Sequence, residues 1–342
     1  QQFLDAGLGS REHAVSTDVR ETALFLVDHD RTQASREVTE ALTSSGYFQV
    51  VGRSEDPDDM VRALDRGDAI VGLQIPRGFA ADLQSGRGAT VQALLDGTNS
   101  NTATVAQGYA ERIILDYGTD RLPDAPALAL ELRDRAWFNP ELESRNYNVP
   151  AVVGAIILLV SLLLTSLAIV REREIGTLEQ LRVSPLTPGE LIAGKTLPFA
   201  VIGLVDLVIV TTVAIFWFDV PFRGGVATLL VASILYLLSG LGIGLLISTI
   251  SSTQQEAFMA TFLIFQPAIL LSGFMFPVSS MPEIFQWMTN LNPTRHFLVI
   301  VRSVFLKGAG PGVLWPQYLA LAAIGTALLW FATARFRAAQ AG

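Results

Sequence analysis

The pattern of hydrophobic and polar positions changes once along the chain, near residue 148. Before this point, short apolar runs alternate with polar stretches; after it, apolar runs continue for 20 residues or more with almost no charge. A helix needs about 20 apolar residues to cross the core of a bilayer. The pattern predicts a polytopic α-helical membrane protein whose transmembrane domain covers 149–342. Its five predicted spans lie at about 149–170, 196–218, 226–250, 257–276 and 313–334.

The amino-terminal part has the pattern of a separate domain, over residues 21–148. Five short apolar runs are typical of strands, and helical spacing occupies most of the segments between them. Strands that alternate with helices indicate an α/β or α+β fold. The predicted strands are 22–30, 48–52, 69–75, 90–95 and 127–137, and the predicted helices are 34–43, 58–64, 79–83 and 102–117.

Residues 277–307 are too polar and too broken to form one span. They predict two short amphipathic helices, 283–291 and 294–306, separated by Asn292-Pro293. Aromatic residues in this segment suit the interface between lipid and water. We expect an interfacial or re-entrant element on the outer face, where irregular backbone has to be buried in protein or line a cavity.

Composition narrows the possible functions. The chain lacks cysteine, which excludes disulfides and thiol chemistry. Residues 1–149 carry 24 acidic and 14 basic side chains, so no basic surface is available for nucleic acid. Asp28, His29 and Asp30 end the first predicted strand, where a solvated turn is favoured over a metal site because alternate strand residues face opposite ways. With no catalytic set visible, the chain is expected to be neither an enzyme nor the holder of a cofactor or metal.

Basic residues beside the spans give a modest bias in orientation. Arg171, Arg173, Arg182 and Lys195 flank the first predicted loop, and two further arginines follow the last span. The bias places this loop, 171–195, in the cytoplasm and residues 1–148 outside it. Arg223, Arg295, Arg302 and Lys307 lie on the opposite side.

The loop from 171 is rich in charge and favours two short helices, at 177–182 and 189–197. Two interpretations stay open on these residues alone: a docking surface for a partner protein, or a solvated turn. Gly189 to Thr196 also matches the pattern of a phosphate-binding loop. That motif works between a strand and a helix, and the residues before Gly189 do not form a strand. Lys195 is better interpreted as an anchor at the membrane boundary.

Several motifs in this part of the chain together resemble one family. Glu172-Arg-Glu-Ile-Gly-Thr-Leu-Glu-Gln-Leu181 and Val183-Ser-Pro185 are similar to the coupling-helix signature of ABC-2 type transporter permeases. The other similar segments, in order, are 14–18, 26–28, 270–277, Met281-Pro282, 291–293 and Arg302 with 305–308.

The resemblance implies the membrane subunit of a bacterial ABC exporter, multi-pass in the cytoplasmic (inner) membrane. Such permeases have six spans with a large outer domain after the first, form dimers, and sit on two ATPase subunits that bind ATP and Mg²⁺. The dimer partner would be a second copy or a related chain. Residues 1–20 are too short and too charged for the first span, so we expect another span before Gln1. The residues expected to couple to the ATPase are Glu172, Arg173, Glu174, Gly176, Thr177, Glu179 and Gln180.

Four further residues are weaker candidates for the translocation path: Asp206, Pro267, Ser272 and Gly273. Asp206 is a charge within a span, where charges are costly and often functional; it faces the path or hydrogen-bonds a neighbouring helix. Gly240, Gly242 and Gly244 permit close helix packing, within a subunit or across a dimer. The substrate is expected to be drug-like, lipid or otherwise amphipathic. The alternatives are a membrane-anchored ligand-sensing module without transport, and an enzyme acting on lipids.

Overall fold

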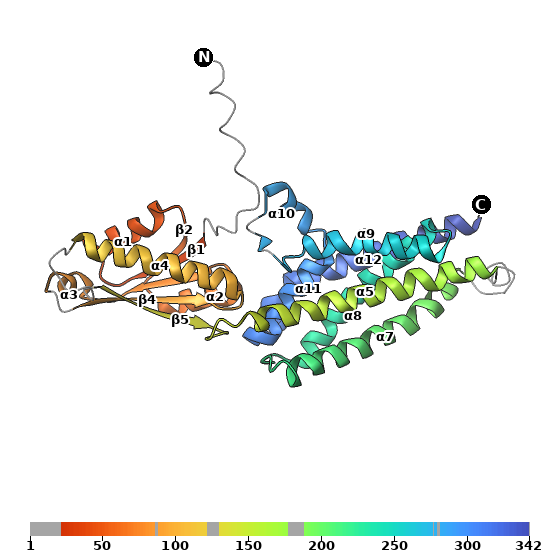
Figure 1. The fold of residues 1–342 in the computed structure, drawn as a ribbon, viewed down its shortest axis with the longest axis horizontal. Coiled ribbons are helices and arrows are strands. Elements are labelled where there is room, and N and C mark those ends of the chain that lie inside the picture. Colours follow the sequence, from red (N-terminus) through yellow and green to blue (C-terminus); the bar gives the residue numbers. More distant parts are fainter. Residues whose placement is uncertain are drawn as a thin grey trace, which may run out of the picture. The chain divides into compact units, whose positions relative to one another are not determined.

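The computed structural model of the 342-residue chain describes residues 22–85, 88–121, 130–176, 188–275, 277–278 and 281–341. They form two compact units, shown in Figure 1: an α/β unit that reaches Glu143 and a helical unit that begins at Ser144. The prediction placed this boundary at 148/149. The helix that contains the first predicted span starts at Ser144, before the predicted boundary, and continues through Pro150 without a break.

The α/β unit alternates strands with helices, as the hydrophobic pattern indicates. Its five strands form one sheet in the order β2-β1-β3-β4-β5, parallel except for the antiparallel pair β3–β4. The strands are β1 (Thr22–Asp28), β2 (Phe48–Ser54), β3 (Val71–Ile75), β4 (Ala89–Asp96) and β5 (Leu130–Trp137), and the helices are α1 (Gln33–Ser44), α2 (Pro57–Arg66), α3 (Phe79–Ser85) and α4 (Ser100–Arg121).

The two faces of the sheet are covered unequally. Helices α1, α3 and α4 pack on one face, where Leu24 and Leu26 of β1 are buried, and α2 packs on the other face against Val27. This alternation follows from the strand geometry, which sends successive side chains to opposite faces. Helix α2 has clear end signals: Asp56 caps its first turn, and Gly67 ends it with a φ of 78°.

The helical unit contains seven α-helices and one π-helical turn among the described residues. They are α5 (Ser144–Ile175), α7 (Pro188–Phe216), α8 (Val226–Ile250), α9 (Gln254–Leu270), α10 (Glu283–Thr289), α11 (Pro293–Arg302), the turn η2 (Ser303–Lys307) and α12 (Pro311–Ala341). Four of them are long and apolar enough to cross a membrane: α5, α8, and the parts Ile192–Phe216 of α7 and Pro311–Arg335 of α12. The predicted count of five is not confirmed, because α9, at the position of the fourth predicted span, has only 17 residues.

Helix α8 lies at the centre of this unit and packs against α5, α7 and α12. A Cβ added to Gly244 would lie 2.8 Å from the Cβ of Thr165 on α5, and one added to Gly242 would lie 2.9 Å from the backbone of Leu329 on α12. Gly240 meets Ser161 of α5 in the same way. Of the two interpretations of this glycine face, the structure shows packing within the subunit.

The two ends of the helical unit differ in construction. At one end, which we call the loop end, α5 and α8 end and α7 and α9 begin. At the other, the break end, the connection between α7 and α8 is bonded to η2: the N–H groups of Arg223 and Gly224 donate to the carbonyls of Phe305 and Val304 at 3.1 and 2.9 Å. The backbone polar groups of this connection are therefore satisfied without a helix or sheet.

Candidate functional site

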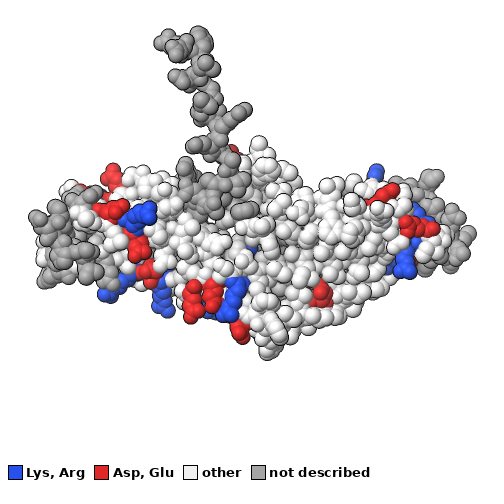
Figure 2. All heavy atoms as spheres, viewed as in Figure 1, with Lys and Arg blue, Asp and Glu red and all other residues white. Residues whose placement is uncertain are grey.

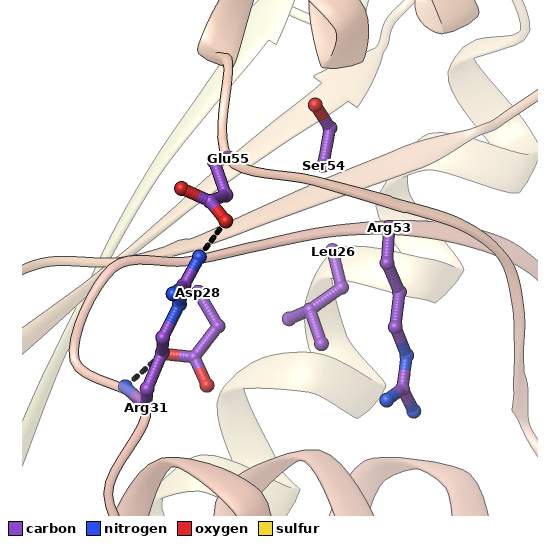
Figure 3. Close-up of a pocket in the computed structure, with 6 residues that line it drawn as sticks. All are labelled: Leu26, Asp28, Arg31, Arg53, Ser54 and Glu55. Atoms are coloured by element: carbon purple, nitrogen blue, oxygen red, sulfur yellow. Dashed lines mark hydrogen bonds and ion pairs between the residues drawn. The ribbon is translucent and has the colours of Figure 1, made fainter.

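The α/β unit has a surface pocket of about 460 Å³ at the carboxyl ends of β1 and β2, drawn in Figure 3. Charged side chains line it, and two of them form an ion pair. Arg31 forms an ion pair with Glu55, and in Figure 3 the Arg53 side chain extends away from that pair. Asp28 accepts hydrogen bonds from the N–H groups of Asp30 and Arg31 and from the Ser35 hydroxyl, at 3.0, 2.9 and 2.7 Å.

The Asp28-His29-Asp30 segment is a turn whose side chains stabilise backbone. Asp30 accepts from the N–H groups of Gly78 and Ala80 at 2.8 and 3.1 Å, which joins the loop after β1 to the loop after β3. Among the described residues, no group of three or more His, Asp or Glu side chains is placed to hold a metal ion.

The strongest candidate site lies at the loop end of the helical unit. It consists of four charged residues and two polar residues that bind them, and we call it the loop-base cluster: Glu172, Arg173, Glu174, Lys195, Ser251 and Gln254. Figure 2 shows that charged side chains gather at this end, whereas the surface of the spans is almost free of them. Within the cluster, Glu172 near the end of α5 forms an ion pair with Lys195 in the first turns of α7. This pair joins the two helices on either side of residues 177–187.

Arg173 and Glu174 reach in a different direction, to the connection between α8 and α9. The Arg173 guanidinium donates to the carbonyl of Ser251 at 2.8 Å. The Glu174 carboxylate accepts from the backbone N–H of Gln254 at 2.9 Å and from its side-chain amide at 2.5 Å. Arg173 thus holds the end of α8 and Glu174 holds the start of α9, and a carboxylate at a helix amino terminus is favoured by the helix dipole.

Gly176 ends α5. Its φ is 79°, a left-handed conformation that glycine adopts without strain, and its N–H donates to the carbonyl of Arg173 at 3.2 Å. Thr177, Glu179 and Gln180 lie outside the described residues. The phosphate-loop pattern of 189–196 falls inside the continuous helix α7, and its Lys195 is paired with Glu172. Helical backbone uses its amide groups internally beyond the first turn, so this stretch does not form the cradle of a nucleotide site.

A second cluster lies at the break end, around the buried guanidinium of Arg302 on α11. This side chain lies 3.6 Å from the centroid of the Tyr147 ring and donates to the carbonyls of Tyr147, Gly273 and Phe274 at 3.4, 3.0 and 3.4 Å. The Tyr147 hydroxyl also donates to Gly273, at 3.1 Å. Arg302 therefore joins α5, α11 and the segment that follows α9.

The structure does not bring the four translocation-path candidates together in one cluster. Asp206 lies in the middle of α7, half-buried, and its buried Oδ2 has no hydrogen-bond partner among the described residues. Pro267, Ser272 and Gly273 belong to the end of α9, which packs on α5 rather than on α7. There, the Ser272 hydroxyl donates to the carbonyl of Ile269 at 2.6 Å, and Gly273 turns the chain with a φ of 79°.

Three residues of these two clusters were not predicted to have a role: Gln254, Ser251 and Tyr147. Their partners are about 80 to 155 residues away in sequence, and polar residues near a helix end are ordinary in any loop. Arg302 did carry a signal, since it interrupts the apolar run Phe297–Phe305 and a charge in such a run needs partners.

The chain matches the model of the family described as "ABC-2 family transporter protein" over residues 10–334. It is 35% identical to the "Probable multidrug ABC transporter permease YbhR" of Escherichia coli, over 92% of this chain and 87% of that protein. Identity is 32% to the "Probable multidrug ABC transporter permease YbhS" of the same organism, over 94% and 88% of the two chains. The chain is 30% identical to the "Inner membrane transport permease YhhJ" of Escherichia coli, over 92% of this chain and 84% of that protein. The chain therefore belongs to the ABC-2 transporter family, as a multi-pass transport permease.

Proposed function

We propose that this chain is the membrane subunit of an ATP-driven exporter in the bacterial inner membrane. ATP and Mg²⁺ bind a separate ATPase subunit, and the loop of residues 171–195 receives the movement of that subunit on the cytoplasmic side. Residues 1–148 then lie outside the cytoplasm. The permease acts as a dimer, with a second copy or a related chain as its partner.

One observation supports this proposal above the others: at the loop end, the loop-base cluster joins acidic and basic side chains of neighbouring helices by an ion pair and hydrogen bonds. Glu172, Arg173 and Glu174 bind α7 and the start of α9, so they position the base of the loop. The residues proposed to contact the ATPase directly follow Gly176 and are Thr177, Glu179 and Gln180. A push on the loop would reach three helices at once.

The substrate we propose is drug-like, lipid or otherwise amphipathic. The spans enclose apolar surface with one charge, Asp206, and two relatives are named as multidrug permeases. Asp206, Pro267, Ser272 and Gly273 are proposed to face the translocation path. If Asp206 does so, Asp206→Asn lowers transport of cationic dyes relative to neutral ones, while the amount of folded protein stays the same.

The proposal is tested by reconstituting the chain with its ATPase in lipid vesicles and measuring ATP-dependent movement of a fluorescent amphipathic dye. We expect transport that requires both proteins and hydrolysable ATP. Glu174→Gln should lower the amount of dye moved per ATP, whereas Glu40→Gln, an exposed change on α1, should not. Dye movement by the chain without an ATPase, or a loop that labels from the outside, would overturn the proposal.

A further inference from the structure

Helices α5 and α9 are joined by polar contacts at three levels along their length. At the loop end, Glu174 binds Gln254 through two hydrogen bonds. In the middle, the hydroxyls of Ser166 and Thr261 lie 3.1 Å apart and are fully buried. At the break end, Tyr147 donates to Gly273, the turn that follows α9.

These contacts span a long distance on one continuous helix. Tyr147 and Glu174 both belong to α5, and at 1.5 Å per residue they are roughly 40 Å apart. Their partners run the opposite way along the chain, from Gly273 to Gln254, as an antiparallel neighbour requires. The pairs Glu174–Gln254 and Ser166–Thr261 share one register, since they are 8 residues apart on α5 and 7 on α9, and they resist sliding of either helix along the other. The third contact lies beyond the end of α9 at Leu270 and fixes the turn that follows it.

Helix α9 has few contacts besides these; one is the side-chain amide of Asn292, which donates to the carbonyl of Ala268 at 2.7 Å. Among the described residues, it packs mainly against α5 and only slightly against α8. Met259 and Leu263, on its opposite side, are 65% and 76% exposed. An element with one substantial neighbour follows that neighbour when it moves.

We propose that Gln254 is a positioning residue through which the coupling loop drives α9, and that α5 and α9 move as one body during transport. This inference rests on the proposed function. The displacement enters at Glu174, which follows directly on the pair between Glu172 and Lys195. The displacement reaches Gly273, where the chain turns after α9 and where Arg302 and Tyr147 donate hydrogen bonds to the Gly273 carbonyl.

The first test changes the Glu174–Gln254 contact in the reconstituted complex. Gln254→Ala removes the side-chain donor, and Gln254→Glu places two carboxylates face to face. We expect both to lower dye transported per ATP hydrolysed, by about tenfold for loss of one charge-assisted hydrogen bond, and the second more than the first. Gln255→Ala is the matched control, since Gln255 is the exposed neighbour on the same turn.

An exchange of the two groups separates coupling from folding. In the double variant Glu174→Gln with Gln254→Glu, the amide and carboxylate trade places and the hydrogen bond between them is restored. We expect transport per ATP to recover to within about threefold of the unchanged chain, by the non-additivity expected of contacting residues. Normal coupling in Gln254→Ala and Gln254→Glu, or no recovery in the exchange, would overturn the role of Gln254.

The second test asks whether the helices move together. The chain has no cysteine, so Ser166→Cys with Thr261→Cys introduces a single possible intramolecular disulfide. The oxidised form should still transport, with each single variant as the control for oxidation. Failure to oxidise, or transport that stops on oxidation and returns on reduction, would contradict the inference. Absence of transport by the unchanged complex would contradict the proposed function instead.

Discussion

The Arg302 guanidinium lies over the ring of Tyr147, 3.6 Å from its centroid, although 155 residues separate them in sequence. The positive charge is buried in the helical unit and is satisfied by carbonyl oxygens and by the face of the ring. Cation–π contacts of this kind strengthen when water is excluded. The pair joins α5 to α11 at the break end, close to the end of α9.

Removing Arg302 should therefore destabilise the helical unit. In Arg302→Met, the carbonyls of Tyr147, Gly273 and Phe274 lose the hydrogen bonds from Arg302, although Gly273 keeps the one from the Tyr147 hydroxyl. We expect a loss of about 2–4 kcal/mol in the free energy of unfolding. Tyr147→Phe keeps the ring and removes one hydroxyl, so its loss should be about 1 kcal/mol. Thermal unfolding of the purified proteins in detergent measures the order of the two variants. A midpoint for Arg302→Met equal to that of the unchanged chain would show that the contact contributes nothing.

Gly176 should be sensitive because of its backbone alone. A Cβ at this position would meet nothing within 4 Å, but φ is 79°, so Gly176→Ala is expected to strain the end of α5 by about 1 kcal/mol. The strain would redirect the loop and lower transport per ATP. Gly108→Ala, in open space within α4 and with an ordinary φ, is the control and should have no effect. Equal coupling in both variants would remove Gly176 from the proposed coupling residues.

The pair between Glu172 and Lys195 predicts a charge exchange. Glu172→Gln or Lys195→Met leaves one half-buried charge without its partner, which should cost about 1–2 kcal/mol, between the values for exposed and buried pairs. Glu172→Lys with Lys195→Glu restores opposite charges and should recover much of that loss. Thermal unfolding at low salt measures both the loss in the single variants and the recovery in the double variant. Additive losses in the double variant would mean that the two side chains do not interact.

The glycines of α8 predict a steric effect. Gly244→Ala would place a methyl group against Thr165 and the carbonyl of Leu162, and we expect a loss of about 1–3 kcal/mol from overpacking. Gly312→Ala, where nothing lies within 4 Å, should be neutral. The yield of folded protein in the membrane and its unfolding midpoint report both. A tolerated Gly244→Ala would show that α5 and α8 separate more easily than their close packing indicates.

Local patterns in the sequence were enough to predict most elements. Each strand of the α/β unit follows from a short apolar run. Asn292, part of the predicted break, caps the start of α11. The two short helices before the last span were likewise marked by the Asn292-Pro293 break between them.

The sequence could not predict the contacts between those elements. Charges at 172–174 indicated a polar loop base, but nothing in their spacing identifies Lys195 or Gln254 as the partners, because the pairing depends on how three helices meet. The fourth predicted span is shorter than its apolar run for a similar reason. Pro267 lies inside α9, and the chain turns at Leu271 to Gly273 although the sequence there remains apolar.

The bonds between η2 and the connection after α7 have a mechanical consequence. Backbone groups of Arg223 and Gly224 bind those of Val304 and Phe305 directly, so the connection between α7 and α8 stays tied to η2 whichever side chains these positions carry. Only a proline at 223 or at 224, which has no N–H to donate, would remove one of these bonds.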